Sequence, residues 1–191
     1  MTLKEVYPKI YLAKFPNQYE LTSTFMRVQE FYESPFDNIK DKNFSWEDFF
    51  DAYVKNGQLT YWKDWTGFNV SSEALLYFFF TFSLTKRETE LFNLLMSYNV
   101  DFEKPFYLIG IYRNQDLSHE LAHGLYSINE NYRLEAQKLV AALPPKEFNK
   151  RCQELATSLY APEMFVDEIQ AYGVSNKERV FLSLYNKYRR I

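Results

Sequence analysis

The segment His119-Glu120-Leu121-Ala122-His123 contains both histidines of this 191-residue chain and decides how the rest of the sequence is interpreted. On a helix, the four-residue spacing places both imidazole rings on one face, one turn apart, where their nitrogens can converge on a single ion. Glu120 flanks this face and can accept a proton from a water molecule bound to that ion. The pattern H-E-x-x-H therefore predicts a metal centre with a general base. The alternative interpretation is a helix whose histidines and glutamate only form hydrogen bonds.

The third protein ligand of such a centre has to be a carboxylate. A catalytic zinc site needs three protein ligands and an open position, and the chain has no third histidine. In the extended motif H-E-x-x-H-x-x-G-x-x-H the third histidine follows six residues after His123, and Asn129 occupies that position. In Asp167-Glu168-Ile169-Gln170-Ala171-Tyr172, Glu168 and Tyr172 lie one helical turn apart and can both face the metal. Asp167 points about 100° away from Glu168 around the helix, so it is the rival ligand or a supporting partner, and spacing alone leaves this choice open.

These residues resemble the gluzincins, the zincin metallopeptidases that hold zinc with two histidines of one helix and a glutamate of a later helix. The resemblance covers the segment from His119 to His123 and Glu168. It implies that His119, His123 and Glu168 bind Zn²⁺. It further implies that Glu120 is the general base and that Tyr172 stabilises the developing oxyanion.

The resemblance also implies a role for the strand that precedes the histidine helix. In gluzincins this strand often aligns an extended peptide substrate, and Tyr107, Ile109 and Ile111 are the residues expected to do so here. The whole chain is also similar to a poorly characterised group of small microbial and viral proteins. That similarity is carried by the segments Gln18-Tyr19-Glu20-Leu21, Phe31-Tyr32-Glu33-Ser34-Pro35 and Asp167 to Tyr172.

Hydrophobic periodicity and turn residues predict a predominantly helical α+β fold. We expect one zincin-like domain over residues 1–191, with sheet and helices in about 1–115, metal-site helices in about 116–191, and a small sheet packed beside the histidine helix. The expected strands are Tyr7 to Phe15, a hairpin formed by Gln58 to Trp62 and Gly67 to Val70, and Phe106 to Tyr112.

Helix boundaries are predicted from capping signals. Asn17-x-x-Glu20, Ser45-x-x-Asp48 and Thr85-x-x-Glu88 each open a helix, and Gly57 can end the second of these helices. Asp116 is expected to cap the histidine helix. A further signal, Ser175-x-x-Glu178, is expected to cap the last helix.

Composition limits the class of protein. The net charge of -3 gives no general attraction to nucleic acid, so no nucleic-acid partner is expected. The longest apolar run, from Ala74 to Phe80, is much shorter than the roughly 20 residues of a membrane-spanning helix. A single cysteine, Cys152, cannot form an internal disulfide, and the chain begins without an apolar secretory signal. We therefore expect a cytoplasmic protein without a membrane partner.

Three classes of function fit these observations. The first is a zinc-dependent peptidase or amide hydrolase that acts on a peptide or protein substrate, with Glu120 as general base. The second is another metalloenzyme, because two histidines and one carboxylate can also hold Fe(II) for oxygen chemistry. The third is a non-catalytic interaction protein that keeps a zincin-like fold. The flanking Glu120 and the close histidine spacing favour the first class.

Overall fold

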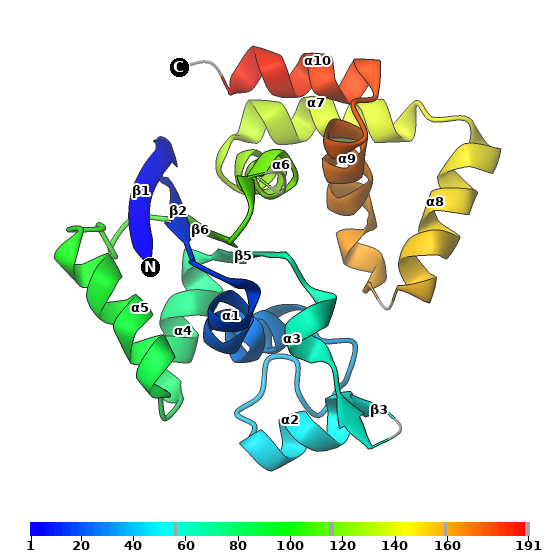
Figure 1. The fold of residues 1–191 in the computed structure, drawn as a ribbon. Coiled ribbons are helices and arrows are strands. Elements are labelled where there is room, and N and C mark those ends of the chain that lie inside the picture. Colours follow the sequence, from blue (N-terminus) through cyan, green and yellow to red (C-terminus); the bar gives the residue numbers. More distant parts are fainter. Residues whose placement is uncertain (56, 115–116, 159, 190–191) are drawn as a thin grey trace. The chain divides into compact units, whose positions relative to one another are not determined.

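A small mixed sheet and a larger number of helices make up the computed structural model, which describes residues 1–55, 57–114, 117–158 and 160–189 (Figure 1). The predominantly helical α+β class is therefore as predicted. The chain divides into two compact units, Met1–Asn114 and Gln115–Ile191. The zincin-like single domain and the position of its sheet beside the histidine helix remain predictions. Asp116, the expected cap of that helix, lies outside the described residues.

The first unit contains a four-stranded sheet in the order β1-β2-β6-β5. Its strands are β1 (Thr2–Tyr7), β2 (Ile10–Lys14), β5 (Gly67–Ser71) and β6 (Tyr107–Ile111). Strands β1 and β5 run antiparallel to their neighbours, whereas β2 and β6 are parallel. All five residues of β6 are buried, so side chains on both faces of this central strand are covered.

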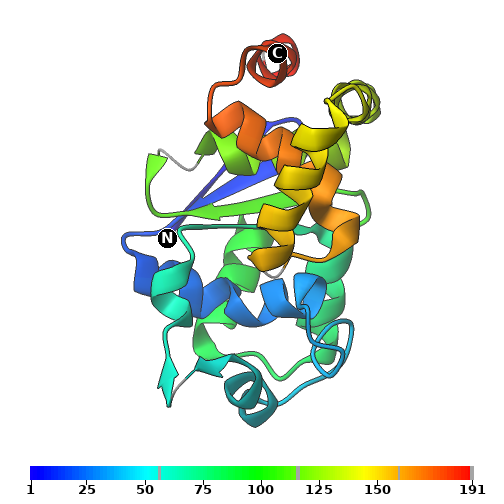
Figure 2. The ribbon, with the colours of Figure 1, turned by 90° about the vertical axis from the view of Figure 1, so that its right-hand side faces the viewer.

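Helices of the first unit pack on one side of this sheet (Figures 1 and 2). The helices are α1 (Gln18–Glu33), α2 (Trp46–Tyr53), α3 (Tyr61–Asp64), α4 (Ser72–Thr81) and α5 (Lys86–Ser97). The predicted start of each capped helix is confirmed. Ser45 and Thr85 form complete capping boxes, and the Asn17 side chain accepts a hydrogen bond from the Glu20 backbone at 2.9 Å.

The core of the first unit depends on a close contact between α1 and β6 at Gly110. The Phe25 ring stacks on Phe68 with a centroid distance of 5.6 Å, and Phe68 is the cross-strand partner of Gly110. A Cβ atom at position 110 would lie 2.6 Å from Phe25 Cε2 and 2.9 Å from Leu21 Cδ1. Glycine is therefore required here because the phenyl ring of α1 rests directly on the strand.

Two strand predictions in the first unit are wrong in detail. The predicted strand Tyr7 to Phe15 is instead the end of β1, a tight turn with Lys9 at φ 66°, and β2. The predicted hairpin of Gln58 to Trp62 with Gly67 to Val70 does not form. The end of the first half and the start of the predicted turn form α3, Tyr61–Asp64. Gly67–Ser71 pairs with β6 instead, because this pairing buries Phe68 and Val70 in the core.

The prediction that Gly57 ends α2 is wrong. The helix ends at Tyr53 and continues into a two-residue strand, β3 (Val54–Lys55), which pairs with β4 (Gln58–Leu59). Gly57 adopts φ 74° between them. Glycine reaches this left-handed conformation without a steric penalty, so the residue serves a tight turn instead of a helix terminus.

The second unit consists of helices alone in its described residues. These are α6 (Leu117–Ile128), α7 (Glu130–Ala141), α8 (Pro145–Thr157), the short 3-10 helix η2 (Pro162–Met164), α9 (Phe165–Ser175) and α10 (Arg179–Tyr188). Helix α9 packs against α6, α7, α8 and α10. Across the described part of the chain, no helix is long and apolar enough to cross a membrane.

The predicted cap of the last helix is wrong. Ser175 is the final residue of α9, and α10 begins after Glu178 without a side-chain capping hydrogen bond. The Glu178 carboxylate instead accepts two hydrogen bonds from the Arg151 guanidinium, at 3.1 and 2.9 Å. This bidentate ion pair to α8 takes the place of the local capping interaction.

We predict that Gly110→Ala lowers the free energy of unfolding by about 1–3 kcal/mol, the usual cost of overpacking a core. The added methyl group has to displace the Phe25 ring or the Leu21 side chain. Urea denaturation measures the change. In a Phe25→Leu background the same substitution should cost less, because the ring that it meets is gone. An equal cost in the two backgrounds would contradict the assigned contact.

Candidate metal centre

The candidate metal centre lies between α6 and α9, within the second unit. The six consecutive residues from Glu120 to Leu125 of α6 are buried, and the face that carries His119 and His123 lies against α9. Helix α9 meets this face through Glu168 and Ala171, and Ala171 is completely buried. A small residue at this position allows the two helices to approach closely, so side chains from both helices reach a common point.

Three donor groups converge at that point. The Nε2 atoms of His119 and His123 are 3.1 Å apart. Glu168 Oε1 lies 3.6 Å from His123 Nε2, and Glu168 Oε2 lies 3.8 Å from His119 Nε2. Two nitrogens bound to one ion at about 2.0–2.1 Å, with an angle of about 90–110° between them, would be separated by about 2.8–3.4 Å. His119, His123 and Glu168 can therefore hold a metal ion with little rearrangement.

Burial makes this arrangement costly without a cation. The side chains of His123 and Glu168 are 2% and 4% exposed, and that of His119 is 18% exposed. Glu168 Oε2 is buried and accepts no hydrogen bond from the described residues. Because a buried carboxylate oxygen without a partner is destabilising, this atom fits the role of a metal ligand.

The surrounding charges shift the pKa values of all three groups. Burial, together with the charge of His123, lowers the pKa of His119 to about 3, so its imidazole is neutral. Burial also favours neutral His123, but the carboxylates of Asp167 and Glu168 outweigh it and raise the pKa well above its usual value. Burial raises the pKa of Glu168 to about 7, against the opposing charge of His123. A divalent cation would relieve this excess of buried negative charge.

The structure distinguishes the positions of Asp167 and Glu168. Asp167 Oδ1 lies 3.0 Å from His123 Nδ1, the ring nitrogen that faces away from the donor cluster. Asp167 is therefore placed to support His123 from behind, whereas Glu168 faces the point of convergence. A carboxylate behind a ligating histidine fixes the orientation and tautomer of its ring.

Two residues that the sequence interpretation missed extend this support. Gln170 Nε2 donates to Asp167 Oδ1 at 2.8 Å, and the Tyr132 hydroxyl donates to Gln170 Oε1 at 2.7 Å. Tyr132 and Gln170 are fully buried. The three-residue spacing of Asp167 and Gln170 was a usable signal, because it places them on adjacent turns of one helix. Tyr132 comes from α7, and no local pattern indicates that it reaches α9.

Glu120 and Tyr172 lie near the donor cluster. Glu120 is 6% exposed on α6. Burial has the largest effect on the pKa values of His123, Glu168 and Tyr172, and the negative charge of Glu120 adds an upward shift to all three. The Tyr172 ring packs edge to face on His119 with centroids 4.8 Å apart, while 40% of the residue is exposed. The Tyr172 ring thus contacts the donor cluster, and Glu120 lies close enough to influence its charges.

The predicted substrate-aligning strand has a different environment from the one its role requires. Tyr107, Ile109 and Ile111 belong to β6, which is paired along its whole length with β2 on one side and β5 on the other. An extended peptide binds by adding to an unpaired strand edge. Because both edges of β6 are occupied, this strand cannot align a substrate in the described arrangement.

Comparison of the chain with protein-family models, with curated proteins and with solved structures found no match. The resemblance to gluzincins therefore remains a prediction based on the motif and the later glutamate. Function has to be inferred from the geometry and chemistry of the site itself.

We predict that the chain binds about one divalent ion and that His119→Ala, His123→Ala and Glu168→Gln each abolish stoichiometric binding. Each substitution removes a donor from the cluster. Elemental analysis after dialysis, together with titration by Zn²⁺, measures the stoichiometry. The matched variant Asp167→Asn should still bind one ion, with affinity about 10–100-fold lower, as is usual when the support of a ligand is lost. Loss of stoichiometric metal in Asp167→Asn, with retention in Glu168→Gln, would reverse the assignment.

Metal affinity should also rise with pH between about 6 and 8. Glu168, with a pKa of about 7, and His123, with a raised pKa, both carry protons at the lower pH, and a bound cation has to displace them. His119 is already neutral and adds no pH dependence in this range. Each displaced proton changes affinity about tenfold per pH unit. Calorimetry in two buffers with different ionisation enthalpies measures the released protons, and their absence would contradict the prediction.

Proposed function

We propose that this chain is a zinc-dependent hydrolase of peptide bonds or related amide bonds. The convergence of His119, His123 and Glu168 within one small buried volume is the observation that carries the proposal. Two imidazoles and one carboxylate are a usual protein ligand set for catalytic zinc, and they leave a further position open. Glu120 favours hydrolysis over oxygen chemistry at an Fe(II) site, since it provides the proton acceptor that amide hydrolysis uses.

Zinc, when bound, would polarise the scissile carbonyl and lower the pKa of a coordinated water molecule. Glu120 is proposed to accept a proton from the attacking water and to return it to the leaving nitrogen. Its burial keeps the carboxylate out of bulk water, which strengthens its interaction with nearby charges. Asp167, held by Gln170 and Tyr132, would keep the His123 ring in one orientation throughout.

Tyr172 is proposed to stabilise the negative charge that develops on the carbonyl oxygen. Its ring contacts His119, and its hydroxyl forms a hydrogen bond with Tyr160. Burial is the main reason that its pKa is raised, so the hydroxyl keeps its proton at neutral pH and remains a donor. A donor of this kind contributes most when it is already positioned before the charge develops.

We predict that Glu120→Gln retains zinc but lowers turnover by about 10²- to 10⁴-fold, the usual contribution of general acid-base catalysis. Glutamine keeps the shape of the side chain and removes the proton acceptor. Peptide libraries are offered to the wild type and the variant in parallel, with the zinc content of both preparations measured. Equal hydrolysis by the two zinc-loaded proteins would eliminate Glu120 as the base.

Tyr172→Phe is the companion variant in this assay. It should keep fold and zinc, and lower the rate by about 10²- to 10³-fold if the hydroxyl stabilises the oxyanion. A much smaller loss would assign Tyr172 to packing against His119. If neither wild type nor variants cleave any peptide while zinc is bound, the result favours the non-catalytic interaction protein.

A further inference from the structure

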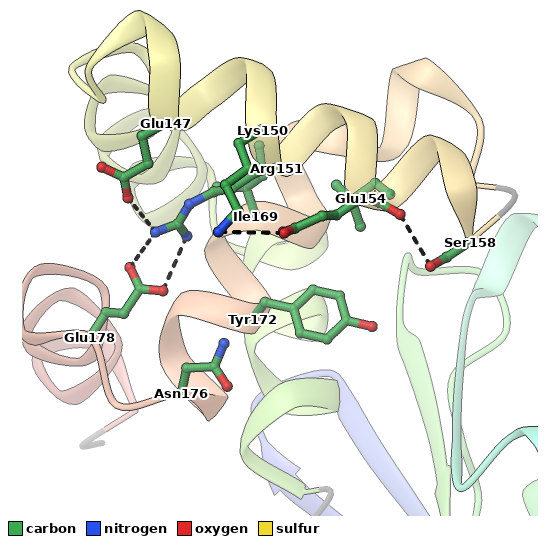
Figure 3. Close-up of a pocket in the computed structure, with 10 residues that line it drawn as sticks. Glu147, Lys150, Arg151, Glu154, Ser158, Ile169, Tyr172, Asn176 and Glu178 are labelled. Carbon is green, nitrogen blue, oxygen red and sulfur yellow. Dashed lines mark hydrogen bonds and ion pairs between the residues drawn. The ribbon is translucent and has the colours of Figure 1, made fainter.

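A groove next to the metal centre lies between α8 and α9 and has a volume of about 530 Å³ (Figure 3). Its walls are formed by Glu147, Lys150, Arg151, Glu154, Leu155, Ser158, Ile169, Tyr172, Asn176 and Glu178. Binding sites for small ligands usually have volumes of about 300–1,000 Å³. The groove is therefore large enough for one bulky side chain or a small molecule.

Tyr172 connects this groove to the donor cluster. Its ring packs on His119, and it also forms part of the groove wall. Of the three candidate ligands, His119 is the most exposed, at 18% of its side chain. A substrate would therefore approach a bound metal from the His119 side. When a substrate is bound on that side, a substituent next to its scissile amide can reach the groove beside Tyr172.

The charged groups of the groove already have partners. Arg151 donates to Glu178 through two nitrogens and to Glu147 at 2.5 Å. Lys150 Nζ lies 3.7 Å from Glu154 Oε1. In Figure 3 these groups point toward one another across the upper wall. The Lys150–Glu154 pair is largely exposed and contributes little. The Arg151 guanidinium is mostly buried, so an acidic ligand would have to displace Glu147 or Glu178 from it, whereas an uncharged ligand leaves these pairs intact.

The remaining lining residues are uncharged. Leu155, Ile169 and Tyr172 are apolar or aromatic, and Ser158 and Asn176 are polar. Leu155 and Ile169 are only 6% and 1% exposed, so Tyr172, which is 40% exposed, provides most of the accessible apolar surface of the groove. The Asn176 side chain is exposed and makes no hydrogen bond to the described residues. Burial of an apolar group against these three side chains is favourable in proportion to the area removed from water. The groove thus suits an uncharged aromatic or long aliphatic group.

We infer that the α8–α9 groove is the substrate subsite that receives an uncharged apolar side chain next to the scissile amide. This inference rests on the proposed hydrolase function, because it assigns the groove to the same substrate that the metal centre binds. The subsite would select aromatic or long aliphatic residues over acidic and basic residues.

Four hydroxamates, which bind active-site zinc through the same group, test this assignment on the zinc-loaded protein. They are acetohydroxamate, 3-phenylpropionohydroxamate, succinic monohydroxamate and 6-aminohexanohydroxamate, each measured by calorimetry. The phenyl compound should bind about tenfold or more tightly than acetohydroxamate, since its ring becomes buried in the groove. The acidic and basic compounds should show no comparable gain.

Two tryptophan variants locate the effect. Ser158→Trp places a large ring in the groove and should remove most of the advantage of the phenyl compound, while acetohydroxamate binds as before. Gln153→Trp is the matched control, because Gln153 lies on α8, the helix that Ser158 caps, but does not line the groove. It should leave both affinities unchanged.

The outcomes separate the two proposals. Equal binding of all four compounds, a preference for a charged compound, or an unchanged phenyl advantage in Ser158→Trp would each overturn the subsite while leaving the metal centre intact. If the chain does not take up zinc, or if zinc is bound but acetohydroxamate is not, the proposed hydrolase function fails and the subsite fails with it.

Discussion

Several ionisable side chains share one buried volume between α6 and α9. The contacts of the second unit at this place have to compensate their charges. Glu120, Asp167 and Glu168 bring negative charge to a place from which water is largely excluded, and their charges favour the protonated form of His123. Such a group of charges is costly unless each member is paired or bound to a cation. A divalent ion held by the two imidazoles and Glu168 would meet this requirement.

The need to pair buried polar groups also explains why the hydrogen bonds that hold His123 in place extend to residues far from the donor cluster. A histidine that binds a metal through one ring nitrogen needs a fixed partner at the other, and Asp167 occupies that place. Asp167 is itself held by Gln170, which is held by Tyr132 from a third helix. Because His123, Gln170 and Tyr132 are buried, each of them requires a polar partner, and α6, α7 and α9 are joined by a single chain of contacts.

Tyr172 occupies the boundary between this buried centre and its surroundings. Its ring makes an edge-to-face contact with His119, and a large part of the residue remains exposed beside the α8–α9 groove. The charge pairs of that groove also serve the fold, since Arg151 links α8 to the start of α10 through Glu178. The proposed subsite is therefore built from the contacts that hold α8, α9 and α10 together.

The amino-acid sequence by itself determined the donor types, the helical spacing of the two histidines and the helix starts at Asn17, Ser45 and Thr85, because these depend on neighbours within one or two turns. Tertiary structure decided which face of α9 meets α6, and hence the different positions of Asp167 and Glu168. It also brought Tyr132 to the site and enclosed β6 between two strands. Helical periodicity relates residues on one element, whereas the rotation and pairing of elements depend on packing between segments far apart in the chain.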